Sequence, residues 1–263
     1  MTTSPDRFVG RFAALRAEGR KALVVYATAG HPDRAGSLAL LRGAADAGAD
    51  IIEVGIPFSD PLADGPVIQA SSQRALALGM TFDGALELVA EAHLSVPVVI
   101  FTYLNPLLAA GPDALEQGAR AGASGILVTD LPVGADAALE HRIGEGPLAF
   151  IRLVAPTTPE SRMEAIARHG RGFVYLISRL GVTGERDDVS ADLPATIHRL
   201  RAVTSLPICV GFGISRPDQA VAVARLADGV VVGSAVVHAA DTNIERAIDL
   251  VASLRTAMDD ARV

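Results

Sequence analysis

Three carboxylates lie within twelve residues of one another, in and just after one apolar run. Glu53 interrupts the apolar residues 51–54, and Asp60 and Asp64 follow in a proline-rich segment. Burial raises the pKa of a carboxyl group, so a glutamate inside the fold can donate a proton near neutral pH. The alternatives are a structural carboxylate paired with an arginine or, for the three acids together, a divalent metal site. We expect a catalytic acid at Glu53.

Glycines at the ends of the last two expected strands are typical of an anion site. Gly211-x-Gly213 begins at the end of strand 207–211, Gly233-Ser234 follows strand 229–232, and glycine lets backbone N–H groups approach a phosphate closely. Ser215 could also cap the next helix. The alternative is a set of ordinary turn glycines with a helix cap. The pairing favours a site for the phosphate of a small molecule.

The three tyrosines of the chain, Tyr26, Tyr103 and Tyr175, all lie at or near the carboxyl half of an expected strand. Tyrosine on a strand is usually part of the core. Their common position equally favours the wall of a pocket. Aromatic walls, a buried acid and a phosphate anchor together suit a planar substrate with a phosphorylated tail.

Short apolar runs alternate with amphipathic segments, and this pattern predicts a (β/α)8 TIM barrel. The apolar continuity is typical of parallel strands that are covered on both faces. A doubly wound sheet would carry G-x-G-x-x-G after its first strand, and residues 28–32, TAGHP, do not match it. Strands are expected at 22–27, 51–55, 98–103, 125–129, 149–154, 172–177, 207–211 and 229–232, with intervening helices that include 36–47, 82–92, 112–121 and 217–226.

Ahead of the first strand, Phe8, Phe12 and Leu15 recur at helical spacing and predict an extra helix that closes the barrel floor. No linker or low-complexity tract divides residues 1–263, so one catalytic domain is expected. The net charge of −7, the aromatic content of 4% and the absence of Trp argue against nucleic acid as a partner. With neither a signal-peptide core nor a membrane-length apolar run, we expect a cytoplasmic protein.

Several other chemistries are disfavoured by where their residues fall. The active site of such a barrel lies at the carboxyl ends of its strands, whereas the single lysine, Lys21, precedes the first strand. Of six histidines only His31 lies in a loop at the carboxyl ends, so no metal site is expected. The single Cys209 excludes a disulfide framework within the chain.

The chain resembles the tryptophan synthase α subunit family, most specifically at residues 52–66, which read IEVGIPFSDPLADGP. The resemblance runs through the whole chain. The further matching segments are Thr102-Tyr103-x-Asn105-Pro106, Asp130-Leu131-Pro132, Tyr175-Leu176-Ile177-Ser178, Gly181-Val182-Thr183-Gly184, residues 211–215 and Gly233-Ser234-Ala235.

This resemblance implies cleavage of indole-3-glycerol phosphate to indole and glyceraldehyde 3-phosphate, a retro-aldol step with no cofactor in this chain. In the family, the glutamate matching Glu53 is the general acid/base. The aspartate matching Asp64 accepts a hydrogen bond from the indole N–H. Tyr175 matches a tyrosine near that glutamate. The remaining matches are Phe212 beside the substrate and the phosphate-binding positions Gly184, Gly213, Gly233 and Ser234.

The resemblance also implies a partner. Family α subunits bind a β subunit that carries pyridoxal phosphate, usually as an αββα heterotetramer, and pass indole to it. The loop with Asp60 and Pro61 and the loop around Thr183 respond to that partner in the family. Residues 179–190 have the length and charge of a mobile lid over the substrate, or of a merely solvated loop.

Three other functions are compatible with the same fold. A stand-alone lyase would release free indole without a partner. Another barrel that binds a phosphorylated indole is disfavoured by the 52–66 signature. A silent regulatory subunit would bind substrate without turnover, and the intact Glu53 and Asp64 argue against it.

Overall fold

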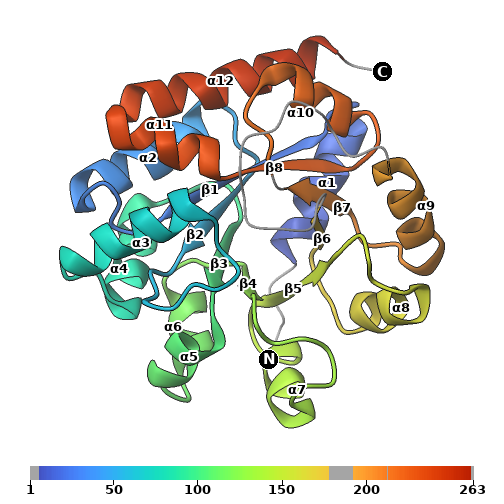
Figure 1. Ribbon diagram of the computed structural model, residues 1–263, viewed down its shortest axis with the longest axis horizontal. Helices are drawn as coiled ribbons and strands as arrows, with labels where there is room; N and C mark the ends of the chain where they lie inside the picture. The colour runs from blue at the N-terminus through green and yellow to red at the C-terminus, as the bar shows by residue number, and fades with distance from the viewer. Residues whose placement is uncertain (1–5, 178–191, 212, 262–263) are drawn as a thin grey trace.

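Eight parallel strands form a closed barrel in the computed structural model, which describes residues 6–177, 192–211 and 213–261. Each strand pairs with the next one along the chain, and β1 pairs with β8 to complete the ring (Figure 1). The predicted barrel is confirmed. The strands are β1 (Ala22–Thr28), β2 (Ile51–Gly55), β3 (Val98–Thr102), β4 (Gly125–Val128), β5 (Ala149–Val154), β6 (Val174–Ile177), β7 (Ile208–Gly211) and β8 (Gly229–Val232).

Helices surround the barrel and cover its outer face (Figure 1). Four helices of the described residues exceed one per strand, because α1 precedes β1 and two helices follow each of β2, β3 and β8. The helices of the described residues are α1 (Arg7–Ala17), α2 (Arg34–Asp46), α3 (Pro66–Ala77), α4 (Phe82–Ala92), α5 (Leu104–Ala109), α6 (Ala114–Arg120), α7 (Ala137–Gly144), α8 (Glu160–Arg168), α9 (Leu193–Val203), α10 (Pro217–Ala224), α11 (Ser234–Thr242) and α12 (Ile244–Asp260).

The strands are apolar on both faces because neither face meets water. In β1, Leu23 and Val25 belong to the core between the barrel and the helices, and Ala22 and Val24 belong to the separate core inside the barrel. Successive side chains of a strand point to opposite faces, which explains this division. The same alternation turns Glu53 of β2 toward the interior.

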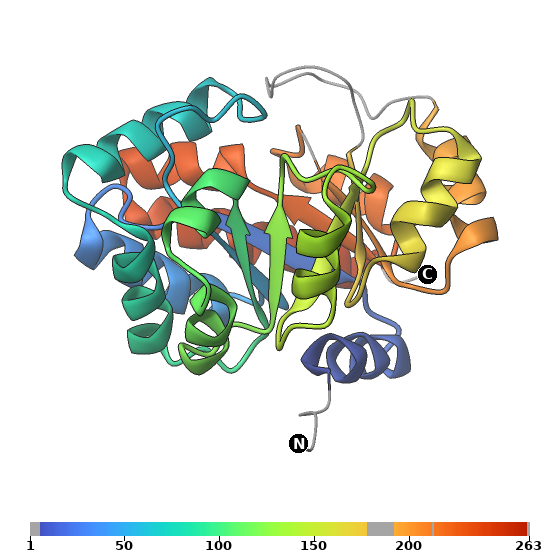
Figure 2. The same ribbon diagram turned by 90° about the horizontal axis from the view of Figure 1, so that it is seen from below.

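Helix α1 closes the amino ends of the strands, as the spacing of its apolar residues predicts. Asp6 caps it by accepting a hydrogen bond from the Phe8 N–H at 2.8 Å. Phe8, Phe12 and Leu15 join the core inside the barrel, where the Phe8 ring meets Phe173 edge-on at 5.8 Å. Figure 2 shows α1 below the barrel, at the end from which the strand arrows start.

A buried carboxylate ties this floor together. Asp50, fully buried, accepts hydrogen bonds from the Leu23 N–H at 2.7 Å and from the Arg255 guanidinium at 3.1 Å, and it pairs with Arg11. Arg255 also donates to the Lys21 carbonyl oxygen at 3.0 Å. Helices α1 and α12 are thereby joined to β1 and to the turn before β2, so both ends of the described chain are fixed at one end of the barrel.

Two strands that contribute to the site end at residues other than those predicted from the sequence. Strand β1 ends at Thr28, one residue beyond the expected end at residue 27, and Tyr26 lies within it. Strand β3 ends at Thr102, and Tyr103 is the residue that precedes α5. Within the described residues, no helix combines the length and the apolar character that crossing a membrane requires.

We expect Phe8→Ala to lower the free energy of unfolding by about 3 to 5 kcal/mol, because it leaves a cavity in the floor core. Urea denaturation followed by far-UV circular dichroism measures the change. Val9→Ala on the same helix is the matched control, since Val9 is 65% exposed, and it should change stability by less than about 0.5 kcal/mol. Equal losses in both variants would contradict the closing role of Phe8.

Candidate active site

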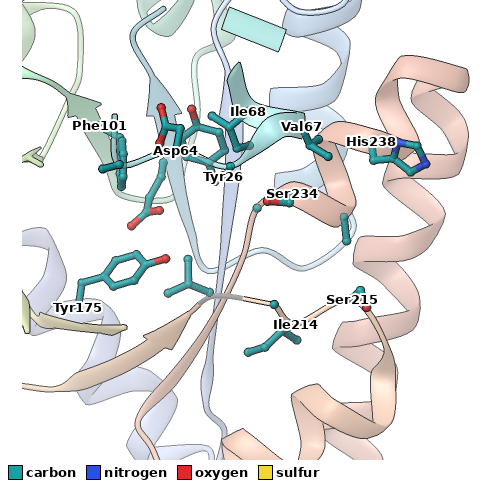
Figure 3. A pocket seen from close by; sticks show the side chains of 17 residues that line it. Tyr26, Asp64, Val67, Ile68, Phe101, Tyr175, Ile214, Ser215, Ser234 and His238 are labelled. Carbon is teal, nitrogen blue, oxygen red and sulfur yellow. The ribbon is translucent and has the colours of Figure 1, made fainter. Parts of the chain in front are cut away.

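A cavity of about 310 Å³ opens at the carboxyl ends of the strands (Figure 3). Its walls come from strands β1, β2, β3, β6 and β8 and from the segments that follow β2, β7 and β8. This is the end at which barrel enzymes carry their active sites. The lining residues are Tyr26, Glu53, Ala63, Asp64, Gly65, Val67, Ile68, Phe101, Tyr175, Gly213, Ile214, Ser215, Val231, Gly233, Ser234, Ala235 and His238.

Glu53 lies at the inner end of this cavity, between Tyr26 of β1 and Val99 of β3 in the strand register. It is 1% exposed, and neither carboxyl oxygen has a hydrogen-bond partner among the described residues. Burial alone raises the pKa of Glu53 to about 8. No arginine of the described residues is hydrogen-bonded to Glu53, and the raised pKa keeps the carboxyl group mostly protonated at neutral pH.

Two tyrosine hydroxyls reach into space that glycines leave open. A Cβ atom at Gly55 would lie 2.0 Å from the Tyr26 hydroxyl oxygen, and one at Gly211 would lie 2.2 Å from that of Tyr175. Any larger residue at either position would displace a ring. Tyr26 and Tyr175 line the cavity, and the Tyr26 ring meets Phe101 edge-on at 5.3 Å. Gly211 thus serves ring packing in β7.

Asp64 approaches the same cavity from the segment between β2 and α3. The Tyr103 hydroxyl accepts a hydrogen bond from the Ala63 N–H at 2.9 Å and is also hydrogen-bonded to the Asp64 carboxylate. The Gln69 side chain donates to the Asp64 carbonyl oxygen at 2.9 Å. Burial raises the pKa of Asp64 to about 6, against the opposing hydrogen bond from Tyr103. Asp64 is therefore mostly ionised at pH 7.

The sequence predicted that Tyr103, like Tyr26 and Tyr175, forms part of the pocket wall. In the structure Tyr103 does not line the cavity; it lies behind the segment with Asp64 and binds this segment through its hydroxyl group. Its ring packs against Phe58 of the same segment at a centroid distance of 5.2 Å. The side chain supports a cavity residue and is not itself a wall.

The opposite end of the cavity is formed by backbone suited to an anion. Gly213 adopts φ +81°, Gly233 is the residue that caps α11, and Ser234 begins that helix. The first N–H groups of a helix have no partners within it and favour negative charge. Ser215 does not cap α10 as expected. Arg216 holds that position, and the N–H of Ser215 donates to the Gln219 side chain at 2.9 Å.

Three expected site residues, Thr183, Gly184 and Phe212, lie outside the described residues, as does the expected lid at 179–190. Asp60 and Pro61 do not line the cavity; they lie on the adjoining part of the loop, where Asp60 is exposed. Leu62 beside them is 90% exposed.

Sequence reasoning missed several lining residues. Phe101 could have been found from the strand alternation, since it lies two residues after Val99 on the inner face of β3. Ile68 and His238 are on helices, where only helix orientation brings them to the cavity. The spacing of four residues between Ser234 and His238 is the one available signal, because such residues share a helix face.

Other chemistries find no support in the described geometry. No three side chains of His, Cys, Asp or Glu within the described ranges converge as metal ligands. Lys21 lies directly before β1, at the floor of the barrel. Cys209 is buried inside the barrel, where burial raises the pKa of its thiol well above the usual value.

The sequence matches the family model described as tryptophan synthase alpha chain over residues 12–262. A tryptophan synthase alpha chain from Gluconacetobacter diazotrophicus is 46% identical over 91% of this chain and 89% of its own length. One from Citrifermentans bemidjiense is 48% identical over 88% of each chain.

Solved structures show the same likeness in three dimensions. A Mycobacterium tuberculosis tryptophan synthase chain has a TM-score of 0.90 at 36% identity, with 99% of this chain and all of the other covered. The tryptophan synthase subunit alpha of Legionella pneumophila has a TM-score of 0.87 at 34% identity, with 98% and 100% covered. With a match along nearly its whole length and the same closed barrel, this chain belongs to the tryptophan synthase alpha chain family.

Proposed function

We infer that this chain cleaves indole-3-glycerol phosphate to indole and glyceraldehyde 3-phosphate, with residues 1–263 acting as one catalytic domain. The observation that carries the assignment is the pair of acids in one apolar cavity. Glu53, with a pKa of about 8, and Asp64, with a pKa of about 6, hold opposite protonation states at neutral pH. Such a pair can supply an acid and a stabilising anion at once.

In the proposed step, Glu53 donates its proton to ring carbon 3 of the indole, the carbon that carries the glycerol chain. The resulting Glu53 carboxylate then accepts the proton of the hydroxyl on the adjacent side-chain carbon. As that proton leaves, the bond between the two carbons breaks. Its electron pair returns to the ring, giving indole, and the side chain leaves as the aldehyde. Glu53 ends the cycle protonated, so no co-reactant is consumed.

Asp64 stabilises the charge that this protonation creates. When carbon 3 is protonated, positive charge spreads to the indole nitrogen. An ionised Asp64 accepts the N–H hydrogen bond, which strengthens as the charge develops. The Tyr103 hydroxyl, bonded to both Ala63 and Asp64, holds this carboxylate in place before substrate arrives.

The cavity walls suit the two ends of this substrate. Tyr26, Phe101 and Tyr175 provide the aromatic and apolar surface that a flat ring requires. Gly213, Gly233 and Ser234 provide backbone N–H groups for the phosphate, together with Gly184 by family resemblance. By the same resemblance Phe212 and Thr183 contact the substrate.

We propose that a β subunit binds the carboxyl end of this barrel, over the loop that holds Asp60 and Pro61. Leu62 at 90% exposure and Leu108 of α5 at 50% are apolar side chains left uncovered near this opening. Family membership supports an αββα assembly in which the partner, and not this chain, carries pyridoxal phosphate and receives the indole.

We expect Glu53→Gln and Asp64→Asn each to lower kcat/KM by about 10²- to 10⁴-fold, because each removes a group that acts in the transition state. In the unaltered protein, kcat/KM should fall above about pH 8, as Glu53 loses its proton, and below about pH 6, as Asp64 gains one. Indole release across pH 5–9 measures both limbs.

Binding of the substrate to the inactive variants provides the control for this experiment. Isothermal titration calorimetry should show affinity close to that of the unaltered protein, because the phosphate contacts are intact. Near-normal turnover in Glu53→Gln would contradict its role as the acid. Normal binding without turnover in the unaltered protein, alone and with a β subunit, would instead support a silent regulatory subunit.

The burial of Glu53 also predicts a pH-dependent stability. Between its usual pKa of 4.5 and about 8, the folded protein binds more protons than the unfolded chain, so the free energy of unfolding falls as pH rises. The full loss is on the order of 5 kcal/mol. Urea denaturation from pH 6 to 8.5 should show this slope flattened in Glu53→Gln. The exposed Glu87→Gln is the matched control, and an equal slope in all three proteins would refute the burial effect.

Addition of a tryptophan synthase β subunit should raise the rate of indole-3-glycerol phosphate cleavage at least tenfold, because loop closure over the substrate depends on the partner. Steady-state assays with and without the β subunit measure the effect. Leu62→Asp should reduce the apparent affinity for the partner while leaving the rate of the isolated chain unchanged. Rapid turnover that does not respond to a β subunit would identify a stand-alone lyase.

A further inference from the structure

The described residues that line the whole cavity include one basic side chain, that of His238 of α11. They include two carboxyl groups, those of Glu53 and Asp64, and neither lysine nor arginine. A phosphate monoester brings up to two negative charges into this setting, so a cation or a further N–H donor beside it would favour binding.

His238 lies on the same face of α11 as Ser234. The two residues are four apart, and side chains at that spacing are neighbours on a helix surface. Figure 3 shows Ser234 between His238 and Tyr175, which lie toward opposite ends of the cavity. His238 lines the cavity and is also exposed to solvent, so it lies at the cavity mouth.

The neighbouring charged groups are already paired with one another. Arg74 of α3 contacts Asp241 of α11 at 3.1 Å, and Asp241 also lies 3.6 Å from Nε2 of the buried His31. Arg216, which caps α10, contacts Asp218 at 3.0 Å. Neither arginine lines the cavity. His238 is therefore the one basic residue among the described residues that line the cavity.

We propose that His238 is a phosphate-binding residue that completes the anion site formed by Gly213, Gly233 and Ser234. The inference rests on the proposed function, since it assigns the phosphorylated end of the substrate to this end of the cavity. The imidazole donates an N–H to a phosphate oxygen, and its protonated form adds a positive charge. His238 does not touch the reacting carbons, so it affects substrate binding and not the chemical step.

Three substitutions at this position separate charge from hydrogen bonding. His238→Lys supplies a fixed positive charge, His238→Gln keeps an N–H donor without charge, and His238→Glu places a negative charge at the mouth. We expect KM for indole-3-glycerol phosphate to change little in the lysine variant, to rise about 3- to 10-fold in the glutamine variant, and to rise more than 10-fold in the glutamate variant. In all three, kcat should stay within about twofold.

Two ligands distinguish the phosphate from the ring. Glycerol 3-phosphate carries the phosphate alone and indole carries the ring alone, and calorimetry gives Kd for each. Glycerol 3-phosphate affinity should follow the order of the KM values, and 0.5 M NaCl should reduce the differences. Indole affinity should be the same in every variant. Circular dichroism melting curves confirm that each variant is folded.

His141→Glu is the matched control, because His141 is an exposed helical histidine on α7 and does not line the cavity. It should leave every constant unchanged. Unaltered glycerol 3-phosphate binding in all three His238 variants would overturn the proposal, and so would an equal loss of indole binding. A different result would contradict the proposed function itself, namely that the unaltered protein neither cleaves nor binds indole-3-glycerol phosphate.

Discussion

Closure of the parallel sheet is the constraint on which the rest of the molecule depends. Because β1 pairs with β8, the barrel has no open edge, and its interior is filled by side chains that exclude water. A carboxyl group placed there loses its hydration, and Glu53 finds no hydrogen-bond partner among the described residues in exchange. The raised pKa of Glu53 follows from that closure and from no neighbouring charge.

The two ends of the barrel divide stability from function. At the floor, α1 fills the strand ends with aromatic rings, and Asp50 is fully buried with every contact satisfied by Leu23, Arg11 and Arg255. Toward the opposite end, Glu53 is also buried, but its carboxyl oxygens have no hydrogen-bond partner among the described residues. Burial of such a group is unfavourable, so the packing of the rest of the fold must offset its cost.

The cavity also separates its two tasks along its length. In the proposed function, ring chemistry takes place at the inner end, where burial and the Tyr103 hydrogen bond favour opposite protonation states of the two acids. The proposed anion site is at the outer end, where α11 begins. Gly55 and Gly211 do not line the cavity. Because they have no side chains, they leave room for the Tyr26 and Tyr175 hydroxyl groups, which shape the inner end of the cavity.

The sequence by itself determined the barrel, the floor helix, and the position of Glu53, because strand alternation and apolar spacing are local properties that the chain displays directly. It also indicated Asp64 and the glycines after β7 and β8. Tertiary structure alone decided that Glu53 has no partner, that Tyr103 supports Asp64 from behind, that Gln219 and not Ser215 binds the N–H groups before α10, and that His238 reaches the cavity mouth. These facts depend on how helices and loops are oriented against the barrel, and contacts between segments distant in the chain set that orientation.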